Sequence, residues 1–403
     1  MNDFSEERMA SPTEEQLREM AADVAAPVEE RPSDAAPTID EHVLVSVVMP
    51  VYNASAYLAA ALDSLLSQTL SDIEIICIDD GSTDGCLEIL KEYRERDARV
   101  RIVTQNNAGQ SRARNNGLRR ARGVYVAFMD ADDFCEADWL RIVYGLAERT
   151  HADVAVADYD LYRDSLGRFE AAVPSEQNAA FAPDRLVSRS DLPDVLFQLT
   201  DTYVCNKLFR HSFLIEKELS FPEDIALGED AYFLATALSL SDRLCRTEAV
   251  LLHHRVYREQ VKCRTFPKHH AQVIDMFVRL RAFLIGHGMY LPLTASYLHA
   301  SVTRCYKIYG QLGMEDKRAF WNRLHDSVDS LGWGEGVLSA VRDTDAAEFA
   351  ANVEVYTYEQ YFPRLLRGVR LRLGRLRRAR RTAGRRRRIK SFFSTLFGRK
   401  RKE

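Results

Sequence analysis

The feature that most constrains the fold is a regular alternation of short apolar runs with amphipathic stretches, which begins at Val43. The runs are rich in β-branched residues and recur about every 24–30 residues, at Val43–Met49, Ile73–Ile78, Val100–Val103, Val124–Met129 and Val154–Ala157. This interval is typical of βαβ units. Near-continuous apolar strands belong in a parallel sheet that helices cover on both faces. The sequence therefore predicts an α/β, Rossmann-like domain with a mostly parallel sheet.

The remaining chain divides into segments of different composition. Residues 1–42 hold 12 acidic residues against 3 arginines and have little apolar pattern, which predicts a disordered segment. The α/β domain is expected over residues 43–265. From His269 to Leu331 aromatic and aliphatic residues recur at helical spacing, so we expect a small helical subdomain over 266–345. Residues 346–403 are expected to form a basic amphipathic tail.

Charge is distributed very unevenly along the chain. The formal net charge is -4, yet residues 364–403 hold 18 Lys/Arg against the single acid Glu403. An acidic body with a basic tail favours attachment to an anionic membrane surface over nucleic-acid binding. RNA binding by the arginines and a merely solvated tail are the competing interpretations of this segment.

Cysteine spacing and hydropathy indicate the cellular compartment. The seven cysteines show no C-x-x-C pair, which argues against a disulfide framework or a zinc site. No signal-peptide pattern and no run of about 18 apolar residues is present in the sequence. We therefore expect a cytoplasmic protein that is peripheral on the inner face of the cell membrane.

Polar clusters follow the first two strands, where open α/β sheets bind their ligands. The first cluster contains Pro50, Tyr52 and Asn53, and its tyrosine ring can lie against a planar base. A capping turn with a half-buried tyrosine is the alternative. The second cluster, Asp79–Asp84, contains Asp80. A turn with a helix cap explains most of it, but two acids before the turn exceed what capping needs.

Two further clusters carry the strongest charges. Residues 106–117 place Arg114 and several amides beside a helix start, which suits an anionic phosphate, although a solvated polar helix is the alternative. Asp130–Asp133 follows the strand Val124–Met129 and holds three carboxylates within four residues. Hard oxygen ligands suit Mg²⁺ or Mn²⁺, so a metal-assisted phosphate site competes here with an exposed acidic turn.

Together, the four clusters resemble glycosyltransferase family two, the inverting enzymes of the GT-A fold, of the kind that builds bacterial surface polysaccharides. The resemblance spans Val43 to Arg264 and is most specific up to Asp133. It implies a donor site that includes Pro50 and Asn53. It further implies that Tyr52 stacks on uracil, that Asp80 binds the edge of the base and that Arg114 supports the nucleotide pocket. It also implies that Asp130 contacts the ribose or a water of the metal, and that Asp132 ligates the metal together with Asp130.

Later segments resemble the acceptor side of the same family. Leu227–Phe233 matches the Glu-Asp motif, in which Asp230 is the expected catalytic base, although a helix N-cap is its alternative role. Glu229 and Lys207 are expected to contact the acceptor or a phosphate, unless Lys207 is simply exposed. His254 stands where the family often has an aromatic residue, so it either ligates the metal, touches the diphosphate or is a satisfied structural histidine.

The resemblance implies a hexosyl- or N-acetylhexosaminyltransferase that uses Mg²⁺ or Mn²⁺. Its donor would be a nucleotide sugar, with UDP favoured, and its acceptor a glycan or lipid-linked hydroxyl. Two other classes were weighed. A sugar-nucleotide nucleotidyltransferase would carry a Gly-rich, Arg/Lys-bearing loop where Pro50–Asn53 stands. A non-catalytic membrane scaffold would be expected to have lost the Asp130, Asp132 and Asp230 carboxylates.

Overall fold

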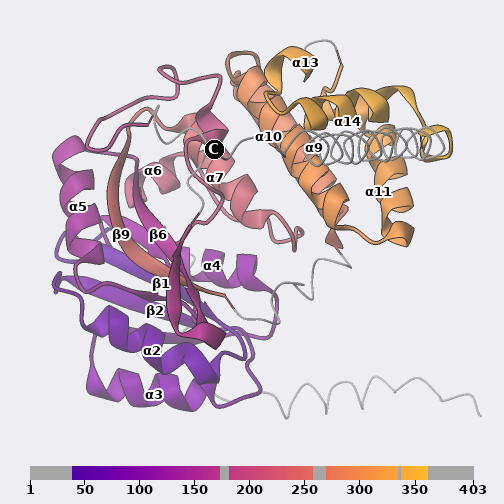
Figure 1. Ribbon diagram of the computed structural model, residues 1–403. Helices are drawn as coiled ribbons and strands as arrows, with labels where there is room; N and C mark the ends of the chain where they lie inside the picture. The colour runs from indigo at the N-terminus through magenta and orange to yellow at the C-terminus, as the bar shows by residue number, and fades with distance from the viewer. Residues whose placement is uncertain (1–38, 173–180, 257–268, 335–336, 362–403) are drawn as a thin grey trace, which may run out of the picture.

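A computed structural model of the protein describes residues 39–172, 181–256, 269–334 and 337–361. Nearly all of the predicted disordered segment 1–42 and most of the predicted basic tail lie outside these ranges. Figure 1 shows an α/β domain built around a curved sheet, with a cluster of helices from the later part of the chain beside it. The predicted strands and helices of the α/β domain can therefore be compared with the structure directly.

The first half of the sheet consists of four parallel strands, each formed by one of the predicted β-branched runs. They are β1 (Val45–Val51), β2 (Ile73–Asp79), β3 (Val100–Thr104) and β4 (Tyr125–Phe128), in the spatial order β3-β2-β1-β4. Every residue of β1 and β2 is buried. This burial is expected of parallel strands that are covered by helices on both faces.

The second half makes the sheet mixed. β8 (Lys207–Arg210) runs antiparallel between β4 and β6 (Val154–Arg163), and β6 then pairs in parallel with β9 (Leu244–Val256). The short strands β5 (Phe134–Cys135) and β7 (Arg168–Ala171) add antiparallel pairs to β9 and β6. The mostly parallel arrangement that the sequence predicts thus describes the first four strands. The antiparallel direction of the later strands could not be predicted, because the apolar pattern of a strand does not show whether it pairs in parallel or antiparallel.

Within the described residues, the α/β domain contains the helices α2 (Ser55–Leu66), α3 (Cys86–Arg96), α4 (Gln110–Leu118), α5 (Trp139–Thr150), α6 (His211–Glu216) and α7 (Glu229–Leu240). Helix α4 lies unusually close to β1. A Cβ atom on Gly117 would stand 2.3 Å from Cγ1 of Val48, so only glycine permits this approach. The close packing brings the start of α4, and with it Arg114, to the carboxyl ends of the central strands.

The helical region consists of α9 (Gln272–Gly286), α10 (Tyr290–Gln311), α11 (Met314–Asp326), α12 (Val328–Leu331), α13 (Val337–Ala340) and α14 (Thr344–Val355). Helix α10 is the longest of these and packs against α9, α13 and α14. Helix α9 also packs against α7, which joins the two parts of the protein. Since α14 continues to Val355, the helical region extends past the boundary at residue 345 that was expected from the sequence.

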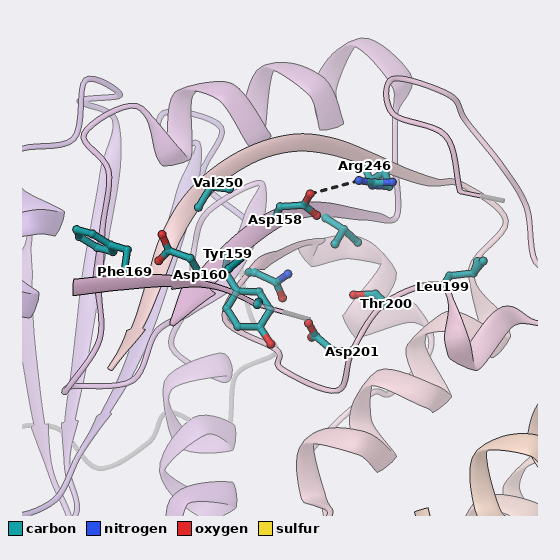
Figure 2. A pocket seen from close by; sticks show the side chains of 13 residues that line it. Asp158, Tyr159, Asp160, Phe169, Leu199, Thr200, Asp201, Arg246 and Val250 are labelled. Carbon is teal, nitrogen blue, oxygen red and sulfur yellow. Dashed lines mark hydrogen bonds and ion pairs between the residues drawn. The ribbon is translucent and has the colours of Figure 1, made fainter. Parts of the chain in front are cut away.

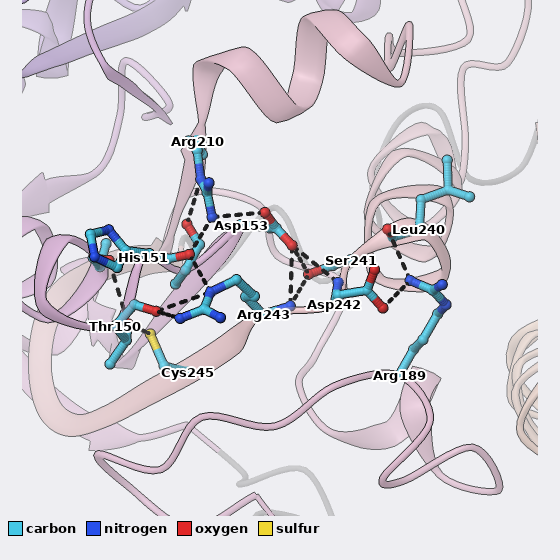
Figure 3. A network of polar contacts seen from close by, with 12 residues as sticks. Thr150, His151, Asp153, Arg189, Arg210, Leu240, Ser241, Asp242, Arg243 and Cys245 are labelled. Carbon is cyan, nitrogen blue, oxygen red and sulfur yellow. Dashed lines mark hydrogen bonds and ion pairs between the residues drawn. The ribbon is translucent and has the colours of Figure 1, made fainter.

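A polar network holds the C-terminal end of α7, at Leu240 and Ser241, in place (Figure 3). Asp153, at the start of β6, accepts hydrogen bonds from the hydroxyl of Ser241 and from the backbone N–H of Arg243, and it pairs with Arg210 at 2.9 Å. Arg189 donates to the carbonyl of Leu240 at 3.2 Å. The last turn of α7 is thereby anchored to the sheet, so its first turn has a defined position.

All six cysteines in the described ranges are buried and unpaired. No helix among the described residues is long and apolar enough to cross a membrane.

Candidate active site

A cavity of about 560 Å³ opens at the carboxyl ends of β1, β2 and β4. It is lined by Pro50, Val51, Tyr52, Asn53, Ala54, Tyr57, Asp80, Asn107, Gly109, Gln110, Ala113, Asp130, Ala131 and Asp132. Six residues singled out from the sequence are therefore brought together in it, from three loops that are up to 80 positions apart. We call this the donor-side cavity.

Tyr52 and Asn53 form one wall of this cavity and differ in what they do. The Tyr52 side chain is exposed, with 52% of the residue accessible, which leaves the ring free to receive a planar ligand. Asn53 adopts a left-handed conformation with φ of 49°, and its side-chain oxygen accepts the Thr83 N–H at 2.8 Å. The nearby cap of α2 is supplied instead by Asp84, which accepts the Ser55 N–H at 3.0 Å. The half-buried tyrosine of the capping-turn alternative is not observed.

Asp80 is buried and shapes the opposite wall. Its Oδ1 accepts hydrogen bonds from the side chain of Gln105 and the backbone N–H of Ala108, both at 2.8 Å, and its Oδ2 accepts the Gly109 N–H at 2.9 Å. A carboxylate oxygen has two lone pairs, so Oδ2 retains acceptor capacity. Asp80 thus fixes the 105–109 loop and can still accept one further hydrogen bond in the cavity.

Arg114 connects the donor-side cavity to α7. Its guanidinium is fully buried and pairs with Asp130 Oδ1 at 2.8 Å and with Asp230 Oδ1 at 2.5 Å. Burial opposes its charge, but the carboxylates of Asp230 and Asp130 raise the pKa of Arg114, so it stays a cation. The guanidinium also lies over the ring of Phe221, 5.2 Å from its centroid. Arg114 therefore bridges two carboxylates that are 100 residues apart, and its support of a nucleotide pocket stays a prediction.

The acidic run after β4 suits a divalent cation. Burial, together with repulsion from Asp133 and Asp130, raises the pKa of Asp132 to about 7. Within the described ranges no ion pair neutralises Asp132, whereas Asp130 is held by Arg114 and by the amide of Gln110 at 3.0 Å. A cation bound by these hard oxygens would relieve the repulsion that the pKa of Asp132 reports. The residues present therefore fit Mg²⁺ or Mn²⁺.

Asp133 faces away from the cavity and holds the loop in place. Its carboxylate accepts hydrogen bonds from the Tyr203 hydroxyl, from the Arg255 backbone N–H at 2.8 Å and from Nδ1 of His254 at 3.1 Å. Ligand atoms of Asp130, Asp133 and Cys205 lie within 4.8 Å of one another. The carboxylate of Asp133 already accepts hydrogen bonds from three donors, and burial raises the pKa of the Cys205 thiol. These three residues are therefore a poorer metal site than the carboxylates of Asp130 and Asp132.

The two histidines at the end of β9 have different environments. His253 contacts Asp160 at 2.7 Å and Glu136 at 3.0 Å, as a satisfied structural histidine does. Burial would lower the pKa of His254, but its hydrogen bond to Asp133 and the nearby carboxylates raise it to about 9. His254 is then a cation at neutral pH, and a cation fits contact with a diphosphate better than ligation of a metal.

Glu229 and Asp230 form the first turn of α7. The N-cap is Gly228, so the alternative role of Asp230 as the cap is wrong. Burial and the neighbouring Asp230 raise the pKa of Glu229 to about 7. Burial also raises the pKa of Asp230, while Arg114 acts in the opposite direction. Asp230 is thus a partly buried carboxylate whose charged form is sustained by one ion pair, which is an environment suited to a general base.

Lys207 does not have the role expected of it. Its ammonium is completely buried and donates to Asn206 Oδ1 at 2.7 Å and to the Tyr203 carbonyl, with Asp201 at 3.4 Å. Burial lowers the pKa of Lys207. Both the expected contact with acceptor or phosphate and the exposed-lysine alternative are corrected, because the side chain instead supports the 201–206 loop from inside.

Several lining residues were not foreseen from the sequence. Tyr57 lies on the first turn of α2, and Gln110, which belongs to the polar cluster 106–117, begins α4. The Arg255 guanidinium donates to the Asp132 carbonyl at 2.9 Å and lies 5.2 Å from the centroid of Tyr57. A signal for Arg255 existed, since it directly follows the histidine pair, but its contact with the acidic run depends on how β9 returns to the site.

A second cavity, of about 370 Å³, lies along β6 and β7 (Figure 2). Asp158 and Asp160 lie on its sheet side, and Thr200 and Asp201 close it from the 199–202 loop. Arg246 pairs with Asp158 at 3.3 Å. This cavity shares no lining residue with the donor-side cavity, so it is a separate feature of the domain.

Comparison with known proteins agrees with the geometry of the donor side. Residues 46–215 match the family model described as glycosyl transferase family 2. The chain is 34% identical over 220 residues to the uncharacterized glycosyltransferase EpsJ of Bacillus subtilis, covering 54% of this chain and 61% of EpsJ. It is 27% identical over 298 residues to a poly(ribitol-phosphate) beta-glucosyltransferase of Bacillus spizizenii, covering 70% of this chain and 44% of that protein. These matches span less than two thirds of either relative.

The fold has a counterpart among solved structures. TarS from S. aureus, in a structure of its residues 1–349 with UDP-GlcNAc, superposes with a TM-score of 0.62 at 20% identity. The likeness covers 77% of this chain and 88% of that one, and it extends beyond the α/β domain. This confirms the expected GT-A fold. The matched family model includes the strands that precede Tyr52, Asp80 and Asp130, so residues 46–215 of this chain are similar to glycosyl transferase family 2.

Proposed function

We propose that this protein transfers a sugar from a UDP-sugar to a hydroxyl of a glycan or lipid-linked acceptor, with inversion, in cell-surface polysaccharide synthesis. The observation that carries the proposal is the bridge formed by Arg114, which joins Asp130 of the donor-side cavity to Asp230 of α7. One buried cation thereby sets the position of the donor-side acids relative to a separate base. A single-displacement transfer needs both a donor site and a separate base that deprotonates the acceptor hydroxyl.

The donor side offers contacts for a nucleotide. The exposed ring of Tyr52 provides a stacking surface for uracil, and Oδ2 of Asp80 provides an acceptor for the base edge. UDP is favoured as the nucleotide because the family resemblance implies it and because TarS is described with UDP-GlcNAc. A hexosyl or N-acetylhexosaminyl group is the sugar we expect.

The acidic run would hold the metal. Asp132, with Asp130, would ligate Mg²⁺ or Mn²⁺, and such an ion supplies charge neutralisation for the leaving diphosphate. The cationic ring of His254 lies beside the same loop and would add positive charge near the diphosphate. The loop itself is kept in place by the Asp133 and Arg255 hydrogen bonds.

Asp230 would act as the base. Its carboxylate is kept in the charged form by Arg114 and can take the proton from the acceptor hydroxyl as that oxygen attacks the anomeric carbon. Attack from the face opposite the leaving diphosphate inverts the configuration. Glu229 would lie beside the acceptor as a second carboxyl group whose pKa of about 7 allows both protonation states.

Membrane attachment through the basic tail is a further part of the proposal, and the tail lies outside the described residues. Each basic residue near anionic lipid adds about 1 kcal/mol. Flotation with anionic liposomes tests it: the full chain should float and a chain ending at Phe362 should not. Equal flotation of both would remove the tail from the account.

The reaction is tested with a panel of nucleotide sugars and Mg²⁺ or Mn²⁺, scored by release of nucleoside diphosphate with and without a chelator. We expect release from one UDP-sugar, dependent on metal and lost in Asp132→Asn. Release that is unchanged by chelation would contradict the metal site, and formation of a nucleoside triphosphate when pyrophosphate is added would indicate a nucleotidyltransferase.

A further inference from the structure

A third cavity, of about 370 Å³, lies where the helical region meets the α/β domain. Its walls come from α7, α9, α10 and the loop around residues 197–202, and these three helices lie together in Figure 1. The floor is apolar and is formed mainly by Leu234, Leu238, Phe277 and Leu280. This surface is much more apolar than a pocket that binds only sugar hydroxyls requires.

Two cations border this apolar floor. Arg304 and Lys307 are spaced three residues apart on α10, so they share one face of the helix. Within the described residues neither has a hydrogen bond or an ion pair. The side-chain oxygen of Thr303, beside them, is shielded from solvent and has no partner among the same residues. These groups provide unused donors for an anion.

The other charged groups that face the cavity do not cancel these cations. Asp201 lines it too, but its carboxylate accepts the Tyr203 N–H at 3.0 Å and faces the Lys207 ammonium at 3.4 Å. His299 also lines the cavity from α10, and its Nδ1 accepts the backbone N–H of Arg342 at 3.5 Å, so it adds no negative charge. The cavity therefore has an excess of positive charge at one end.

The cationic end lies near the proposed base. Ala231, which lines the cavity, directly follows Asp230, and Glu229 is close enough to act electrostatically on Arg304. Leu238 lies seven residues further along α7, and a helix rises 1.5 Å per residue, so the apolar floor continues for about 10 Å beyond the base. With increasing distance from Asp230, the side chains change from carboxylates to the cations of α10 and then to the apolar floor.

This order points to one kind of occupant. We propose that the cavity binds the acceptor and that the acceptor is a sugar joined through phosphate to a lipid. Its sugar hydroxyl would point toward Asp230, its phosphate would lie at Arg304 and Lys307, and its hydrocarbon chain would lie on the floor of Leu234, Leu238, Phe277 and Leu280. The inference rests on the proposed function, because the acceptor hydroxyl must reach Asp230. A neutral glycan would leave the two cations unpaired, and a polyol phosphate would leave the apolar floor exposed.

Binding of dodecyl phosphate to the full-length protein tests this, measured by calorimetry below the critical micelle concentration. Glycerol 1-phosphate and dodecyl maltoside serve as probes that carry only the anion or only the chain. We expect dodecyl phosphate to bind at least about tenfold more tightly than either. The double variant Arg304→Gln/Lys307→Gln should lose at least about tenfold in affinity for dodecyl phosphate, because each charge-assisted hydrogen bond is lost.

The matched control is Lys91→Gln/Arg94→Gln, which removes the same pair of charges at the same spacing on the exposed face of α3. It should change the affinity by less than about twofold. A second variant, Ala300→Phe, fills the cavity from α10 without changing charge and should also weaken binding. Thermal unfolding verifies that each variant is folded.

The outcomes separate this inference from the proposed function. Equal affinity for glycerol 1-phosphate and dodecyl phosphate would contradict the lipid, and insensitivity of dodecyl phosphate binding to Arg304→Gln/Lys307→Gln would contradict the site. UDP binding is measured in the same samples. Its absence in the wild-type protein would overturn the donor side, whereas normal UDP binding with no effect of the α10 variants would overturn only the acceptor cavity.

Discussion

The donor-side cavity and the cavity that we propose for the acceptor, called the acceptor cavity below, are built in different ways. Every residue that lines the donor-side cavity lies between positions 50 and 132, directly after a strand or at the start of a helix. The acceptor cavity draws on four segments between Phe197 and Lys307 and forms only when α7, α9 and α10 pack together. On our proposal, donor recognition would therefore be carried by short local motifs, whereas acceptor recognition would depend on the packing of distant helices.

The two halves meet at Arg114. This residue belongs to the donor-side motif by sequence, yet it pairs with Asp230 of the acceptor side as closely as with Asp130. Variants on each side, and at the bridge, should therefore separate binding of the donor from transfer.

Asp230→Asn should have the largest effect on turnover. Removing a positioned general base reduces the rate of transfer by about 10²–10⁴-fold, while the donor-side cavity keeps its residues. Steady-state kinetics with the preferred donor measures this. The exposed residue Asp72 provides the same substitution as a control, and Asp72→Asn should behave as wild type. If Asp230→Asn keeps more than about a tenth of wild-type turnover, Asp230 is not the base.

Arg114→Ala should affect both sides at once. It leaves two partly buried carboxylates without their shared cation, and breaking a buried pair in this way costs about 3–5 kcal/mol in free energy of unfolding. Chemical denaturation followed by circular dichroism measures the loss. Arg112→Ala, on the exposed face of the same helix, should cost less than about 0.5 kcal/mol. Similar losses in the two variants would show that the bridge is not structural.

Metal affinity should depend on pH through Asp132. Its pKa of about 7 means that a proton competes with the cation below that pH, so the apparent affinity for Mn²⁺ should fall by about tenfold per pH unit between pH 7 and 5. Above pH 7 the carboxylate is charged and the affinity should level off. Titration at several pH values checks this, and a profile that is flat from pH 5 to 8 would speak against Asp132 as a ligand.

Tyr52→Ala should have the smallest effect. Loss of a stacked ring costs about 1 kcal/mol of binding, so UDP affinity should fall by roughly fivefold with no change in stability. Tyr52→Phe keeps the ring and should bind UDP as wild type does. A Tyr52→Phe variant that binds as poorly as Tyr52→Ala would assign the contribution to the hydroxyl rather than to stacking.

The same contrast explains how much could be predicted from the sequence. The strands from β1 to β4 and the residues after them followed from periodicity, because a buried parallel strand and the turn after it are encoded in adjacent positions. Pro50, Tyr52, Asp80, Asp130 and Asp132 all line one cavity as a result. In this half of the protein, the residues that a local sequence pattern singles out are also neighbours in the folded structure.

On the acceptor side they do not coincide. Lys207 was expected to face a ligand, but its side chain is buried. The burial depends on the antiparallel insertion of β8 between β4 and β6, which no local sequence pattern predicts. Arg304 and Lys307 look like ordinary surface residues of an amphipathic helix. Only the packing of α10 against α9, and of α9 against α7, places them beside Asp230's helix.

The most direct test of the account is UDP binding by calorimetry, in the presence of Mn²⁺, for the wild-type protein, Asp132→Asn and Asp230→Asn. The account predicts that UDP binds the wild type, that Asp132→Asn weakens binding by at least about tenfold because the metal is lost, and that Asp230→Asn changes it by less than about threefold. Failure of the wild type to bind UDP, or equal losses in the two variants, would contradict a donor site that is separate from its base.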